Sequence, residues 1–248
     1  MSLREYMVAS RSPRYGLTFA LPLLLLYEGL AAILPGTAIA GIRNGADVLL
    51  KTVFVAFGGR NGLAAFGALF LGIGVVLVWR DRRRHPGPMR GRVLAAMLAE
   101  SIVYAAVFGT VAATLTSLLL AGVPLSIPSA QAGVQPLGLG TQLVVSLGAG
   151  IYEELVFRVL LVSGIAGAGL ALGWRRPVAL AWAIVLSALI FSAFHYIGPL
   201  GDAFTLPSFT FRAIAGLLLS GLYAGRGFGI AAWTHALYDV GLALLGTG

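Results

Sequence analysis

Residues 177–195 read PVALAWAIVLSALIFSAFH, and the first eighteen of them carry no charge. A helix of this length, rising about 1.5 Å per residue, crosses the hydrocarbon core of a bilayer. The whole chain is similar, since 58% of its 248 residues are hydrophobic and only 10% are charged. Barrel strands would instead be short and alternate apolar with polar residues. The sequence therefore predicts an all-α, polytopic transmembrane helix bundle.

Seven apolar runs are long enough to span the membrane. An eighth segment, 39–58, carries Arg43, Asp47 and Lys51 at intervals of four, which form a polar stripe along one helical face. Such a stripe favours a helix that lies in the membrane interface, so we expect seven spans, with eight as the alternative. The seven are residues 17–34, 62–79, 93–121, 140–165, 177–195, 209–224 and 228–245.

Basic residues are distributed unevenly between the two sides of this arrangement. Short cytoplasmic loops collect Lys and Arg, and the seven-span topology puts twelve of the seventeen basic residues on one side. We therefore expect a cytoplasmic N-terminus, in the plasma (inner) membrane of a prokaryote. Topology and anionic lipid explain the pI of 10.4, so we expect no nucleic-acid partner. The twelve are Arg4, Arg11, Arg14, Arg80, Arg82, Arg83, Arg84, Arg90, Arg92, Arg175, Arg176 and Arg226.

The first apolar run imitates a secretory signal, because a basic stretch precedes it and Ala38-Ile39-Ala40 follows it. The run contains Glu28, is longer than a usual signal core, and is followed by six more spans. We expect a retained first helix, with cleavage after Ala40 as the alternative. We assign no chemistry to Glu28 or Glu100, which we expect to pair with tyrosines or water.

Ionisable residues recur inside the predicted spans of the C-terminal region. An ionisable group in hydrocarbon costs at least a few kcal/mol, so such groups mark functional sites. A lone histidine is often a structural hydrogen-bonding group, but three polar groups on separate helices favour an active site. They are Glu153-Glu154 with Arg158, Phe191 with His195, and His235 with Asp239; Arg212 also falls within or near the membrane.

The spacing within the first group assigns its members different roles. Residues four apart share a helical face, whereas adjacent residues diverge by about 100°. Glu154 and Arg158 are therefore expected to form an ion pair, while Glu153 points in another direction. This leaves Glu153 as the candidate general base.

The same rules relate the other two groups to the first. Phe191 lies one turn before His195, where its ring can restrict the imidazole, and His235 and Asp239 share one face. Taking a turn near Trp174, Glu153 and His195 each lie 21 residues from it, so antiparallel helices would bring them to the same depth.

These three groups, in this order, resemble the pattern of the CPBP family, named for CAAX proteases and bacteriocin-processing enzymes and also called the Abi or type II CAAX prenyl endopeptidase family. That pattern is EExxxR, then FxxxH, then HxxxN or HxxxD. Here it is matched by residues 153–158, 191–195 and 235–239. The resemblance covers roughly residues 140–245, whereas the first half is similar only in being hydrophobic.

The resemblance implies an intramembrane endopeptidase that cleaves a membrane-associated peptide or protein. In it Glu153 and His195 activate water, while His235 and Asp239 stabilise the oxyanion or bind a metal. We accordingly divide one integral membrane domain into an N-terminal transmembrane region, 1–139, and a CPBP-like catalytic bundle, 140–248. Asp239 replaces the commoner Asn, and an ionised carboxylate cannot donate to an oxyanion. It must be protonated, orient His235 or ligate a cation.

Metal dependence is open at this point. The chain has no cysteine and no HExxH helix, but Glu153, His195, His235 and Asp239 would make an acceptable Zn²⁺ set. A glutamate-type mechanism uses the same atoms, and we favour it with no cofactor. Two other classes of function are alternatives: a proton-coupled transporter or channel, and a catalytically silent scaffold or immunity protein of the same fold.

Overall fold

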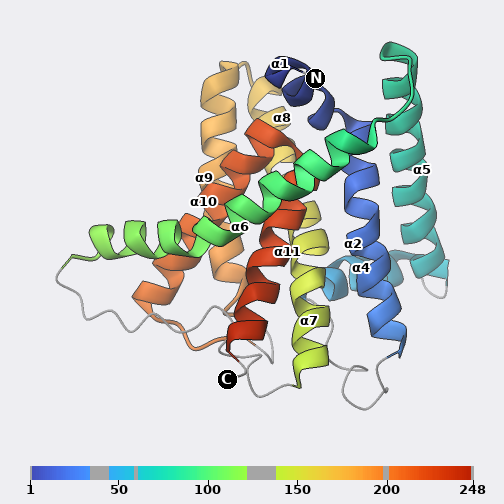
Figure 1. Ribbon diagram of the computed structural model, residues 1–248. Helices are drawn as coiled ribbons and strands as arrows, with labels where there is room; N and C mark the ends of the chain where they lie inside the picture. The colour runs from blue at the N-terminus through green and yellow to red at the C-terminus, as the bar shows by residue number, and fades with distance from the viewer. Residues whose placement is uncertain (1, 34–44, 59–60, 122–137, 198–200, 247–248) are drawn as a thin grey trace.

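The computed structural model describes residues 2–33, 45–58, 61–121, 138–197 and 201–246, which form helices and no strand. Figure 1 shows their arrangement as a bundle. The helices are α1 (Leu3–Ser10), α2 (Pro13–Ile33), α4 (Gly45–Gly58), α5 (Gly62–Arg84), α6 (Gly91–Leu119), α7 (Leu139–Gly148), the π-helix η2 (Ala149–Val162), α8 (Ser163–Ala171), α9 (Arg176–Phe194), α10 (Leu206–Arg226) and α11 (Phe228–Leu245).

Five helices in the described residues are long and apolar enough to cross a membrane, which confirms an all-α, membrane-spanning protein. They are α6, the continuous helix Leu139–Ala171, α9, α10 and α11, and they match the last five predicted spans. The helices α2 and α5 coincide with the first two predicted spans. Their crossing, and the count of seven, stay predictions.

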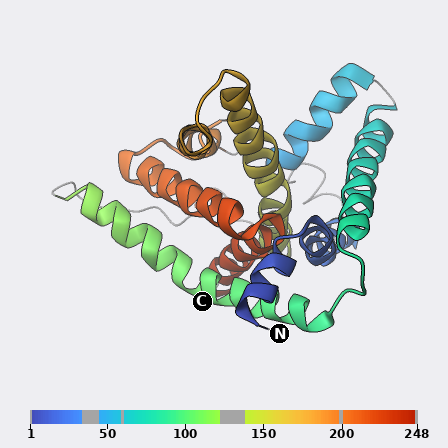
Figure 2. The same cartoon turned by 90° about the horizontal axis from the view of Figure 1, so that it is seen from above.

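The α4 helix has 14 residues and is therefore only about 21 Å long, short of the bilayer core. It runs across the bundle rather than along it (Figures 1 and 2). The expected polar stripe is wrong at Asp47, which is fully buried and accepts a hydrogen bond of 2.8 Å from the Tyr27 hydroxyl. The carboxylate thus points to Tyr27 of α2 and not to solvent. Residues 39–44, with Ala40 and Arg43, lie outside the described residues.

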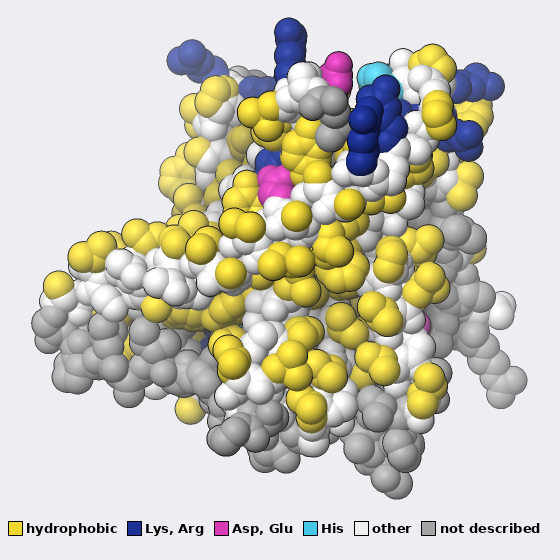
Figure 3. Space-filling view, viewed as in Figure 1, with side chains coloured by type: hydrophobic (Ala, Val, Ile, Leu, Met, Phe, Trp, Pro, Cys, Tyr) yellow, Lys and Arg dark blue, Asp and Glu magenta, His cyan; other side chains and the backbone are white. Residues whose placement is uncertain are grey.

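The basic segments gather at one end of the bundle. Figure 1 places α1, the α5–α6 connection, the α8–α9 turn and the α10–α11 turn at the same end, and Figure 3 shows Lys and Arg concentrated there. This arrangement agrees with the predicted charge asymmetry. We refer to it below as the basic end; its assignment to the cytoplasm stays a prediction.

A core cluster joins the two regions into which we divided the chain. Leu23 and Tyr27 of α2 pack with Val144 and Ile151 of the Leu139–Ala171 helix and with Ala236 of α11. The boundary between 1–139 and 140–248 is therefore not a boundary in packing, and the functional division stays a prediction.

A glycine brings η2 and α11 unusually close together. A Cβ atom at Gly150 would lie 2.5 Å from the Ala232 carbonyl oxygen and 2.6 Å from the Ala236 Cβ. Small residues permit this approach between membrane helices. The contact lies one turn before Glu153 and Glu154 on η2 and beside His235 on α11, so it sets the distance between two of the three polar groups.

Candidate active site

The two glutamates and Arg158 lie on η2, a π-helix within a longer membrane helix. Residue spacing alone does not predict this conformation, which widens each turn and recurs at functional sites. Residues four apart still meet: Arg158 Nη1 lies 3.2 Å from Glu154 Oε1, and both side chains are fully buried. The predicted ion pair is therefore present in the fold.

The His235 imidazole lies between three carboxylates. Its Nδ1 is 2.8 Å from Glu154 Oε1, to which it donates a hydrogen bond. Its other edge, Nε2, lies 3.5 Å from Asp239 Oδ2 and 4.0 Å from Glu153 Oε2. The adjacent glutamates thus approach opposite edges of one ring, which the sequence argument, treating Glu154 only as a partner of Arg158, did not predict.

This arrangement requires a proton at the Nε2 edge of His235. A carboxylate can only accept, so the Nδ1–H is committed to Glu154. A bare nitrogen lone pair facing the carboxylates of Asp239 and Glu153 would be repelled by both of them. A proton on Nε2 or on a facing acid removes that repulsion, so this edge can present a hydrogen-bond donor to a reacting group.

His195 has the opposite arrangement. It is the C-cap of α9, and its Nδ1 lies 2.8 Å from the Phe191 carbonyl oxygen. A carbonyl only accepts, so Nδ1 carries the hydrogen and Nε2 of the neutral ring is left with a lone pair. Glu153 and His235 are close enough to His195 to interact with it electrostatically. His195 can therefore accept a proton near Glu153.

Phe191 connects the three polar groups. Its ring packs edge-on against His195, with centroids 4.8 Å apart, as the spacing predicted. The same ring lies 6.1 Å from the His235 ring, and the Arg158 guanidinium carbon lies 4.5 Å from its centroid. One buried aromatic side chain therefore fixes the positions of both imidazoles and contributes a cation–π contact to Arg158.

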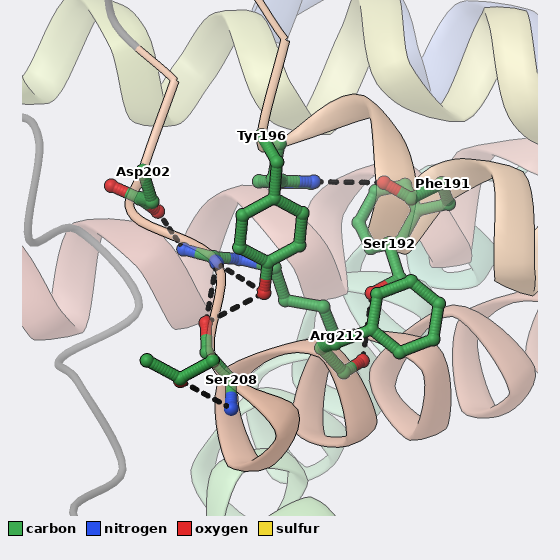
Figure 4. A network of polar contacts seen from close by, with 9 residues as sticks. Phe191, Ser192, Tyr196, Asp202, Ser208 and Arg212 are labelled. Carbon is green, nitrogen blue, oxygen red and sulfur yellow. Dashed lines mark hydrogen bonds and ion pairs between the residues drawn. The ribbon is translucent and has the colours of Figure 1, made fainter.

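A second polar network, missed by the motif analysis, holds the chain that follows His195 (Figure 4). The Asp202 amide donates a 2.9 Å hydrogen bond to the His195 carbonyl, and the Asp202 carboxylate forms an ion pair with Arg212 of α10. Arg212 Nη1 also donates to Ser208 Oγ at 2.7 Å and to the Tyr196 hydroxyl at 3.2 Å. The only sequence signal was an arginine in an apolar helix.

The metal alternative needs three or more converging ligands. Within the described residues, no group of three His, Asp or Glu side chains has the geometry to hold a metal ion. The Nδ1 atoms of the two histidines are bound within the protein, His235 Nδ1 to Glu154 and His195 Nδ1 to the Phe191 carbonyl, which leaves their Nε2 atoms as the nitrogens that could ligate a metal.

Residues 135–241 match the family model of Rce1-like type II CAAX prenyl endopeptidases. The match covers the region that carries all three motifs, from α7 to α11, and it confirms the resemblance predicted from them. It favours a membrane-embedded CAAX protease, a peptide hydrolase, over a transporter or a silent scaffold. No curated protein and no solved structure gives a significant match to the chain.

Proposed function

We propose that this Rce1-like chain is an intramembrane endopeptidase that hydrolyses a peptide bond with water activated by Glu153 and His195. The observation that carries the proposal is the placement of the two histidines: His195, whose Nε2 keeps a lone pair, is close enough to Glu153 to interact with it electrostatically, and His235 presents a donor edge beside Asp239. Acyl transfer to water needs this combination of a base and an oxyanion donor.

In the proposed reaction, Glu153 accepts a proton from a water molecule that His195 Nε2 orients. The hydroxide attacks the carbonyl carbon of the scissile bond, and the carbonyl oxygen takes up the negative charge. His235 Nε2–H stabilises that oxyanion. The C–N bond then breaks, and the proton held by Glu153 passes to the leaving amine. Glu153 returns to its ionised form, so atoms and charge balance.

The remaining motif residues act by positioning these groups. Glu154 fixes the orientation of His235 through Nδ1, and Arg158 balances the charge of Glu154, whose side chain is shielded from solvent. Asp239 keeps a proton at the Nε2 edge of His235. Supporting this assignment, both Glu154 and Arg158 are wholly buried, where a substrate could not reach them.

The proposed chemistry needs no cofactor. Its alternative, Zn²⁺ held by Glu153, His195, His235 and Asp239, would make Glu153 a ligand and remove it from the role of base. The two mechanisms therefore differ in whether a chelator affects the reaction, and the ligand geometry above supports the glutamate type.

The substrate class that we propose is a lipid-associated peptide, and a prenylated CAAX peptide is the first to test because of the family match. Purified protein in liposomes would be incubated with a farnesylated CAAX peptide and its non-prenylated counterpart, with the released tripeptide measured by mass spectrometry. Release by the wild type and none by Glu153→Gln supports the proposal. Equal release by both proteins would contradict it, while cleavage of only the non-prenylated peptide would contradict the substrate class.

A further inference from the structure

Two adjoining cavities lie at the basic end of the bundle, away from the candidate active site. The larger has a volume of about 630 Å³ and lies between α1, the start of α2 and the α5–α6 connection. The smaller, about 300 Å³, lies between α1 and the end of α5. Both are lined by Val8, Ser12 and His85, so they form one continuous groove along α1.

The groove carries a strong excess of positive charge. Its walls contain six arginines and two acids, an excess of four with His85 neutral. Both acids have partners within the protein: Glu5 closes the capping box of α1 with Ser2, and Asp81 lies 3.2 Å from Arg14 Nε and 3.2 Å from His85 Nδ1. The six are Arg4, Arg11, Arg14, Arg80, Arg84 and Arg90.

Two of these arginines face the larger cavity without a counter-ion. Arg4 and Arg90 are exposed, and within the part of the chain that the structure describes their guanidinium groups have no hydrogen bond or ion pair. They come from α1 and from the residue that precedes α6, so they approach the cavity from two elements. A planar guanidinium binds a phosphate through two parallel hydrogen bonds.

The groove also has an apolar side. Val8 and Leu77 line it and remain exposed, and Leu3 beside it on α1 is 76% exposed. Apolar side chains at the membrane interface can insert into the boundary between headgroups and acyl chains. Basic pockets of this kind between membrane helices bind anionic lipid headgroups.

We propose that this groove is a binding site for the phosphate headgroup of an anionic phospholipid, with Arg4 and Arg90 on the phosphate and Val8 and Leu77 against the first part of an acyl chain. A free phosphate would share the contacts to Arg4 and Arg90 but not the apolar ones. The site fixes α1 at the membrane surface, and it requires no catalytic activity.

The test is native mass spectrometry of the full-length protein in neutral detergent, titrated with phosphatidylglycerol or with phosphatidylcholine. The variant is Arg4→Gln with Arg90→Gln, and the matched control is Arg175→Gln with Arg176→Gln, which are exposed at the same end but outside the groove. We expect the wild type and the control to prefer phosphatidylglycerol. The variant should lose about fivefold in affinity for each arginine removed.

Three outcomes would overturn the site: equal weakening in the control, which indicates diffuse attraction; equal binding of phosphatidylcholine; and no change in the variant. Thermal unfolding of both double variants without lipid checks that the fold is retained. Lipid binding by the variant and the wild type is then compared at equal concentrations of folded protein. Inorganic phosphate is the second probe. If it displaces the lipid and stabilises the wild type alone, the ligand is a free anion and the lipid assignment fails.

Discussion

Two buried clusters of charged residues in this molecule differ in how their charges are balanced. At the basic end, Arg226 Nε and Nη2 lie 2.6 Å and 2.8 Å from the two carboxylate oxygens of Glu100, and Ser10 accepts from the same guanidinium at 2.9 Å. The Tyr6 hydroxyl also donates to Glu100. Burial and the Glu100 carboxylate raise the pKa of Tyr6, so it stays a donor at working pH.

The candidate active site has the opposite balance. Three carboxylates, those of Glu153, Glu154 and Asp239, surround His235, and Arg158 is paired with only one of them. A matched pair with full hydrogen bonding is a way to connect helices, as Glu100 and Arg226 connect α6 to α10. An acid-rich cluster in a membrane helix bundle is costly to maintain and is characteristic of chemistry. Charge balance therefore separates a structural network from a reactive one.

The largest expected effect is a loss of turnover, caused by a change in the acid-rich cluster around His235. Glu153→Gln removes the proposed base and should reduce the turnover of a true substrate by at least about a hundredfold, because general-base catalysis contributes factors of about 10² to 10⁴. The melting temperature in detergent should not fall, since the change removes a surplus negative charge. Glu5→Gln, an exposed acid on α1, is the control for activity. Turnover retained by Glu153→Gln would exclude Glu153 from the mechanism.

A change in the Glu100–Arg226 cluster should instead lower the stability of the protein. Glu100→Gln leaves the buried Arg226 without a counter-ion, which costs about 3 kcal/mol or more. We expect a lower melting temperature, with activity per folded molecule within about twofold of the wild type. Thermal unfolding and titration of active protein measure the two effects. A fall in turnover without a fall in stability would mean that the two clusters are not separate in function.

The contact that brings η2 and α11 together should affect both properties. Gly150→Ala places a methyl group 2.5 Å from the Ala232 carbonyl, and overpacking of this kind costs about 1–3 kcal/mol. The helices must separate, which lengthens the contacts of both glutamates with His235 and lowers turnover. Gly221→Ala is the matched control, because nothing lies within 4 Å of its Cβ position. Equal behaviour of the two variants would show that this close approach is not needed.

A smaller effect is expected at Asp239. Asp239→Asn should keep activity within about tenfold and move the pH optimum upward. The proton that Asp239 keeps at the Nε2 edge of His235 is lost as the pH rises, whereas the amide of Asn brings an N–H donor of its own to that edge at every pH. A chelator should leave both proteins active. Loss of activity in the variant, together with chelator inhibition of the wild type that Zn²⁺ reverses, would establish a metalloprotease.

The last prediction concerns which side of the membrane each cluster faces, and it is read from labelling and not from activity. Cysteine at Gly87, in the α5–α6 connection, should react only from the cytoplasm, and cysteine at Gly201 only from outside. The chain has no cysteine of its own, so labelling with an impermeant reagent is unambiguous. Labelling of Gly87→Cys in intact cells would reverse the assignment of the basic end.

Some of the site could be read from the sequence because it depends on spacing within one helix. Glu154 with Arg158, Phe191 with His195, and His235 with Asp239 are each four residues apart, and the covalent chain places such residues together in either an α- or a π-helix. The apolar runs and the distribution of arginines likewise determined the membrane class and the common end of the basic loops.

Only the tertiary structure determined which of these pairs, on different helices, contact one another in the site. Contacts between helices depend on tilt, rotation and small residues such as Gly150, none of which a periodic pattern encodes. For that reason the sequence did not predict the bond from His235 to Glu154, the π-helical turn beneath them, or the connection of Arg212 to the loop after His195. It also misplaced Asp47, because a carboxylate on an apolar helix looks solvent-facing until a neighbouring tyrosine is packed against it.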